Sequence, residues 1–136
     1  LLMESFYVSL AKLKNLKFDI KIEDISLNID TAIPCGLIIN ELVSNAIKHA
    51  FPDNMKGTIS VILSKEKENE IYKLVVRDDG VGINENIDID KTDTLGIQLV
   101  KLLSKQMNGS FEVISHKDKG SEFIIKLEES QYKSRN

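Results

Sequence analysis

Residues 34–51 read PCGLIINELVSNAIKHAF and combine an apolar helical pattern with a row of polar side chains. Glu41 and Asn45 lie four positions apart, so they share one face of a helix. Either Lys48 or His49 continues that face, and the other faces are apolar and must be buried. The polar stripe then faces solvent or a cleft, and the helix alone leaves both alternatives open. In a cleft, a carboxylate, an amide and one or two cations can organise a hard metal ion and phosphate oxygens.

Capping residues and prolines set the limits of this helix. Asp30 or Thr31 is expected to cap it, which places Pro34 in the first turn, where a missing N–H does little harm. The helix is expected to run to about Ala50 because Pro52 stops it.

Hydrophobic spacing predicts the other elements. Residues 1–13 have the spacing of a helix, and residues 17–29 alternate between apolar and polar side chains, as half-buried strands do. The same patterns predict strands at 58–64, 71–77, 110–115 and 122–127, and a helix at 95–107 that Asn108 and Gly109 end. The order αββαββαββ predicts an α+β, two-layer sandwich with helices on one face of a mixed, mainly antiparallel sheet.

Size and charge restrict the function of the chain. Its 136 residues suffice for one domain, and 18 Lys and Arg against 21 Asp and Glu give a formal net charge of −3. This charge argues against non-specific binding to nucleic acid or to an anionic membrane surface. The longest apolar stretch, at 33–39, is too short to span a bilayer. The single cysteine, Cys35, excludes an internal disulfide and fits a reducing, cytoplasmic compartment.

A second candidate segment, VVRDDGVGI at 75–83, ends a predicted strand. Its Asp-Gly pair is also a common hairpin signal, although residues 84–94 do not return as a clear strand. Functionally, a carboxylate at a strand end can accept hydrogen bonds from a flat heterocycle, and two glycines let the backbone approach the ring closely.

A third segment, TLGIQLV at 94–100, opens a helix beside Gly96. Free N–H groups and the helix dipole at the start of a helix favour the binding of phosphate. The signal has low specificity, because many helices begin near a glycine. The preceding residues 84–93 are acidic and carry few large apolar side chains, a pattern typical of a mobile loop.

In this order, the three segments resemble the N box and the two glycine boxes of the GHKL (HATPase_c) ATP-binding superfamily. The superfamily includes gyrase-type topoisomerases, heat-shock chaperones, mismatch-repair ATPases and sensor histidine kinases, and it implies a Bergerat-type fold. Residues 34–51 are most similar to the sensor histidine kinases with Glu in the N box and His-Ala-Phe after its Lys. The closing GSEFII at 120–125 resembles the Gly-Thr strand that ends their catalytic domain, with Ser121 in place of Thr. The resemblance covers about residues 16–127.

The resemblance implies a role for each residue of the polar stripe. Asn45 would be the Mg²⁺ ligand, and Glu41 would orient a metal-bound water or polarise the reacting site. Lys48 and His49 would face the phosphates or the sugar of ATP. Glu41, Asn45 and Lys48 would be the catalytic residues, with ATP and Mg²⁺ as the cofactors.

The glycine segments imply base and phosphate contacts. Asp78 would accept the exocyclic amino hydrogen of adenine, the contact that selects ATP over GTP, and Ser121 would support it. The other implied nucleotide-binding residues form the tight turn (Gly80 and Gly82), the apolar walls (Ile83 and Leu99) and the phosphate-facing backbone (Leu95 and Gly96).

Kinases of this branch phosphorylate a histidine on a separate helical dimerisation segment. The two histidines here, His49 and His116, lie outside the N-terminal helix, so the acceptor is expected upstream and this piece should bind ATP without labelling itself. The expected partners are that segment and a response-regulator receiver domain, with no nucleic acid and no membrane insertion. Three parts are expected: the end of a helix linked to that segment (1–15), the ATP-binding domain (16–128) and a polar tail (129–136).

Two other functional classes stay open. A GHKL ATPase clamp or an anti-sigma-type serine kinase would use the same boxes, although the clamps have a longer lid and a following transducer domain. A degenerate domain that only binds protein partners is the third alternative, against which the intact Glu41 and Asn45 argue.

Overall fold

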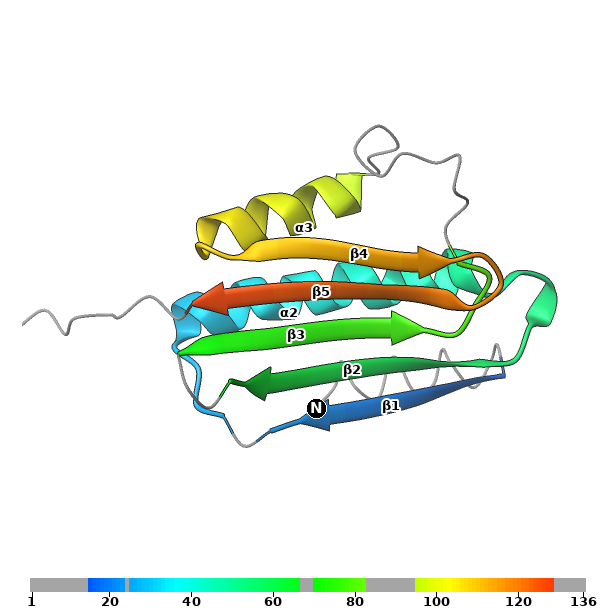
Figure 1. Ribbon diagram of the computed structural model, residues 1–136, viewed down its shortest axis with the longest axis horizontal. Coiled ribbons are helices and arrows are strands. Elements are labelled where there is room, and N and C mark those ends of the chain that lie inside the picture. Colours follow the sequence, from blue (N-terminus) through cyan, green and yellow to red (C-terminus); the bar gives the residue numbers. More distant parts are fainter. Residues whose placement is uncertain (1–14, 24, 67–69, 83–94, 129–136) are drawn as a thin grey trace, which may run out of the picture.

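The computed structural model describes residues 15–23, 25–66, 70–82 and 95–128 (Figure 1). The helix expected at 1–13 and the tail at 129–136 therefore lie outside the described residues. In chain order, the elements are β1 (Leu16–Ile22), α2 (Ile29–Asn45), a π-helical turn (Ala46–Ala50), a 3-10 turn (Pro52–Asn54), β2 (Gly57–Lys65), β3 (Ile71–Asp78), α3 (Leu95–Gln106), β4 (Ser110–His116) and β5 (Gly120–Glu128).

The strands form a five-stranded sheet in the order β1-β2-β3-β5-β4. β1 is parallel to β2, and every other neighbouring pair is antiparallel. Both α2 and α3 lie on one face of this sheet (Figure 1). The expected α+β sandwich with a mixed, mainly antiparallel sheet is confirmed.

The buried apolar side chains of the described residues form one hydrophobic core between the sheet and the helices. Leu74 and Val76 alternate along β3 and are at most 2% exposed. Ile38, Leu42 and Val43 of α2 belong to the same cluster and are at most 1% exposed. The predicted burial of the apolar faces of α2 is therefore confirmed, and it supplies the main favourable term that holds the helix on the sheet.

The strand expected from the alternation at 25–29 is absent. Residues 25–28 have no regular structure, and Ile29 already begins α2. Ile25 and Leu27 still pack against the core as partly buried side chains. The alternation of apolar and polar residues indicates which side chains are buried. An extended connection without strand pairing produces the same pattern as a strand.

The start of α2 also differs from the prediction. The N-cap is Asn28, and its carbonyl accepts the N–H groups of Thr31 (2.9 Å) and Ala32 (2.8 Å). The helix thus begins earlier than an Asp30 or Thr31 cap allows, and Pro34 lies inside the helix rather than in its first turn. An interior proline removes a hydrogen bond at a cost of about 3 kcal/mol. Packing of α2 on the core offsets that cost.

The helix ends agree better with the sequence. The helix that begins with α2 continues to Ala50 as expected, although its last five residues form a π turn. α3 ends in a left-handed Asn108 (φ 52°), and Gly109 N–H donates to the carbonyl of Ser104 over 2.8 Å. This C-terminal motif satisfies free carbonyls of the last turn. None of the helices in the described part of the chain is long and apolar enough to cross a membrane.

A pair of neighbouring residues on α2 tests the core directly. Ile38 is fully buried, whereas Leu37 is 44% exposed. We expect Ile38→Ala to lower the free energy of unfolding by about 2–5 kcal/mol, because it leaves a cavity. Leu37→Ala removes a similar side chain from the surface and should cost less than about 1 kcal/mol. Urea denaturation measures both, and equal losses would contradict this placement of the helix.

Candidate functional site

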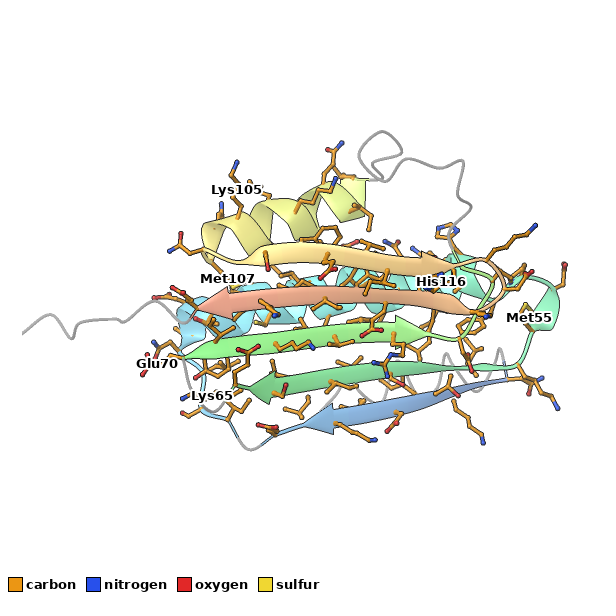
Figure 2. The ribbon with its side chains drawn as sticks, in the orientation of Figure 1. Met55, Lys65, Glu70, Lys105, Met107 and His116 are labelled. Atoms are coloured by element: carbon orange, nitrogen blue, oxygen red, sulfur yellow. The ribbon has the colours of Figure 1, made fainter. Side chains whose placement is uncertain are left out.

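Three elements meet at the end of the molecule that holds the candidate residues. α2 with its π turn and β3 both end there, and α3 begins there, at the right of Figure 1. Figure 2 shows His116 of β4 and Met55, which precedes β2, at this same end. Lys65 and Glu70 lie at the opposite end. The fold therefore gathers the three sequence segments that were singled out as candidates.

Glu41 and Asn45 form a half-buried polar pair on α2, beneath the first turn of α3. A Cβ added at Gly96 would collide with Oε2 of Glu41 and would lie 3.7 Å from Nδ2 of Asn45. Among the residues that the structure describes, neither of the two side chains forms a hydrogen bond or an ion pair. The half burial of both side chains beside Gly96 shows that the polar stripe is not simply a solvent-exposed face.

A π turn carries the two basic candidate residues. Lys48 and His49 are both exposed on the turn Ala46–Ala50. A π turn has i→i+5 hydrogen bonds and so holds more than four residues. Both basic residues lie three to four positions after Asn45 on this turn and are accessible from solvent. Such turns inside α-helices frequently lie at functional sites.

Asp78 is a buried carboxylate at the end of β3, with 6% of its surface exposed. Gly80 N–H donates to its Oδ1 over 3.0 Å, and the backbone N–H of Ser121, its register partner on β5, is a second donor. Burial raises the pKa of the Asp78 carboxyl above its ordinary value, and the charge of Asp79 adds to this. The two backbone hydrogen bonds oppose the rise but do not cancel it.

This burial predicts a pH dependence of stability. The pKa of Asp78 is raised from its ordinary value of 3.8, so the native state holds a proton that the unfolded chain releases at lower pH. The native state binds more protons in that window, and the free energy of unfolding therefore falls as pH rises through it. We expect Asp78→Asn to gain stability relative to the wild type as the pH rises above the ordinary value of 3.8. Urea titrations at several pH values measure the difference, and a constant difference would contradict the expectation.

The glycine segment after Asp78 is held by backbone contacts to two other elements. Val81 N–H donates to the carbonyl of Ala50 over 2.9 Å, and the carbonyl of Val81 accepts Asp118 N–H over 2.8 Å. A Cβ at Gly80 would collide with the carbonyl of Ala50. These contacts fix the strand end that carries Asp78 beside the π turn that follows Asn45.

Gly82 has a positive φ of 74°, and a Cβ there would collide with the carbonyl of His116. Both glycines of this segment are therefore required by backbone conformation or by close approach. The hairpin alternative for the Asp-Gly pair is wrong for the described chain, because β3 pairs only with β2 and β5 and neither follows this turn directly.

Ser121 supports Asp78 through its backbone, while its hydroxyl is engaged elsewhere. The Oγ of Ser121 lies 2.9 Å from Oγ of Ser115, in a part-buried hydrogen bond between β5 and β4. Ser115 Oγ also lies 3.4 Å from the carbonyl of Gly120. Ser121 thus contacts Asp78 through its backbone and Ser115 through its hydroxyl.

The three apolar candidates have different surroundings. Leu99 is partly buried and packs against the core, whereas Leu95 is 84% exposed at the start of α3. Ile83 and the loop expected at 84–93 lie outside the described residues. A role of Leu95 through its backbone is compatible with its exposure, because the first N–H groups of a helix have no partner within it.

Residues 31–131 match the family described as Histidine kinase-, DNA gyrase B-, and HSP90-like ATPase, HATPase_c. The chain belongs to this family. It is an HATPase_c domain, and the expected ATP-binding family is confirmed. Membership in an ATPase family implies that the domain binds ATP.

The relatives of this HATPase_c domain are sensor histidine kinases. It is 33% identical over 102 residues to the sensor histidine kinase PdtaS of Mycobacterium tuberculosis, a match that covers 74% of this chain and 20% of PdtaS. It is 29% identical over 98 residues to blue-light-activated histidine kinase 2 of Erythrobacter litoralis, covering 72% of this chain and 28% of that protein. The solved blue-light activated histidine kinase of Erythrobacter litoralis superposes with a TM-score of 0.83 at 25% identity, over 96% of this chain and 42% of that one. The chain thus spans about a fifth to two fifths of the length of these proteins.

These relatives favour the histidine kinase over a clamp ATPase or a serine kinase. Two features of the candidate site were nevertheless not found from sequence. Ser115 was missed because a lone serine in a strand carries no signal. Asp79 stands within the quoted glycine segment but received no role, because only the fold shows its partner.

Proposed function

We propose that this HATPase_c domain binds ATP with Mg²⁺ and donates the γ-phosphoryl group to a histidine on another segment of a sensor histidine kinase. One observation supports this most strongly. The buried Asp78 and the pair Glu41 and Asn45 lie at one end of the fold, linked by the hydrogen bond between Val81 and Ala50. A nucleotide has a base and a charged tail, and these two groups of residues match its two ends.

The base end is Asp78. Its carboxylate has about four lone-pair positions, of which the N–H groups of Gly80 and Ser121 use two. The remaining acceptor positions suit the exocyclic amino group of adenine, and guanine presents a carbonyl oxygen at that place. The proposed preference is therefore for ATP over GTP, with Leu99 and Ile83 as apolar neighbours of the ring.

The phosphate end combines α2, the π turn and the start of α3. Asn45 would bind Mg²⁺ through its amide oxygen, with phosphate and water oxygens as the other ligands, which is the usual mode of this ion. The fit is supported by the half-buried amide without a described partner and by Gly96, where any side chain would displace the carboxylate of Glu41. Bound Mg²⁺ would neutralise charge on the phosphates.

Four of the chain's own residues would complete the phosphate end. The backbone N–H groups of Leu95 and Gly96 would donate to phosphate at the start of α3. His49 and Lys48 would contact phosphate or sugar. Glu41 would orient the reacting groups by accepting hydrogen bonds.

The phosphoryl acceptor is proposed to lie on a different segment. The γ-phosphoryl group would pass from ATP to an imidazole nitrogen of a histidine in an upstream dimerisation segment, and ADP would leave. The phosphate would then pass to a response-regulator receiver domain, in the cytoplasm. We assign the ATP-binding domain to residues 16–128. The Glu and His-Ala-Phe of residues 41–51 support the branch of kinases that carries this version of the N box.

The experiment has a binding arm and a transfer arm. Calorimetric titration of this chain with a non-hydrolysable ATP analogue, with and without Mg²⁺, should show binding that Mg²⁺ strengthens. The full-length protein should become labelled from γ-labelled ATP, with the acid lability of phosphohistidine, whereas this chain alone should not. Absence of binding would refute the proposed site. Acid-stable labelling on serine would instead favour the anti-sigma-type kinase.

A further inference from the structure

Asp79 and Thr58 are joined at the point where the chain leaves the sheet. Asp79 N–H donates to the carbonyl of Thr58 over 3.3 Å, and Thr58 N–H donates to the side-chain Oδ1 of Asp79 over 2.7 Å. The ladder pairs Ile59 with Asp78, so Thr58 and Asp79 stand at the next position of the antiparallel register. Two residues at such a position can exchange both of their backbone hydrogen bonds.

The side chain of Asp79 therefore replaces its own backbone carbonyl in the ladder. Since Oδ1 accepts the Thr58 N–H, the chain can turn towards Gly80 without leaving that N–H unpaired. Gly57 makes the room for this contact. A Cβ there would lie 2.7 Å from Oδ1 of Asp79 and would also collide with the ring of Phe51.

The same junction controls Asp78. The turn that Asp79 permits brings Gly80 N–H to within 3.0 Å of Oδ1 of Asp78. The direction of the Asp78 carboxylate therefore depends on the exit angle of the chain, to which the Thr58 contact contributes beside the Val81–Ala50 hydrogen bond. Without the Oδ1 acceptor, the ladder would recover its bond only if the Asp79 carbonyl rotated back, which would move Gly80.

We propose that Asp79 is a positioning residue for adenine recognition, which holds Asp78 and Gly80 in place by anchoring the strand end to Thr58. The inference rests on the proposed function and adds a determinant of base selectivity to it. Asp79 itself is exposed and acts on the base only through Asp78.

The test compares ATP with inosine triphosphate, which has a carbonyl oxygen in place of the adenine amino group. The wild type should bind ATP more tightly, and Asp79→Ala should reduce the ratio of the two dissociation constants by about tenfold. Asp79→Asn keeps the Oδ1 acceptor and should hold the ratio within about twofold of the wild type. Asp19→Ala is the matched control, because it removes an exposed aspartate from the edge strand β1.

Thermal melts establish that each variant is folded. If Asp79→Ala does not fold, Asp79→Ser replaces it, because the shorter serine side chain reaches Thr58 poorly. If Asp79→Ala only lowers stability, the ratio of the two dissociation constants stays at the wild-type value in the folded protein. That result would overturn the inference. An equal loss of the preference for ATP in Asp79→Asn and Asp79→Ala would overturn the inference too. The charge of Asp79, and not its hydrogen bond to Thr58, would then be responsible. A wild type that does not prefer ATP would refute the proposed function, and the inference with it.

Discussion

Replacing Asp78 with Asn is expected to weaken ATP binding by roughly a hundredfold. The amide group converts one acceptor oxygen into a donor, which would then face the hydrogens of the adenine amino group. Because Asp78 is only 6% exposed, water has little access to relieve the mismatch. The variant should nevertheless remain folded, since it has nearly the shape of the wild type and no charge to bury.

Calorimetry with an ATP analogue measures this loss, and inosine triphosphate makes the result specific. An amide donor can pair with the carbonyl oxygen of inosine, so the preference for ATP is expected to disappear as the affinity for ATP falls. Asp19→Asn, the same change on the exposed face of β1, should leave both affinities as they are. ATP affinity in Asp78→Asn equal to that of the wild type would remove Asp78 from the site.

Replacing Asn45 with Ala is expected to lower the rate of histidine phosphorylation in the full-length protein by about a thousandfold. Phosphoryl transfer depends on positioning and on charge neutralisation, and Asn45 is proposed to tie Mg²⁺ to α2. The removed amide is half-buried beside Gly96, so neighbouring residues have little room to take its place.

The binding readout in this chain isolates the metal contribution. Mg²⁺ should strengthen binding of the ATP analogue in the wild type, and most of that gain should vanish in Asn45→Ala. Ser44→Ala changes the preceding half-buried polar residue, which projects about 100° away from Asn45 around the helix, and should keep the full gain. If Asn45→Ala responds to Mg²⁺ as the wild type does, the metal is bound elsewhere.

Local sequence predicted the elements correctly where the hydrophobic periodicity agrees with the capping and turn residues. The apolar faces of α2, the four strands from Gly57 onwards and the end of α3 at Asn108 appear nearly where they were expected. The failures arose where one pattern fits two structures. The alternation at 25–29 belongs to an extended connection, and the expected cap at Asp30 or Thr31 was replaced by Asn28.

The sequence alone predicted most helices and strands, the candidate residues and the chemistry that those residue types can perform. It could do so because burial patterns and side-chain groups are local properties. The tertiary structure decided which distant residues lie in contact. Val81 is hydrogen-bonded to Ala50 and Asp79 to Thr58, and Gly96 lies close to Glu41. It also decided that the helix ends in a π turn, which carries Lys48 and His49. These features depend on contacts between residues far apart in the chain, and such contacts exist only once the sheet and helices have packed.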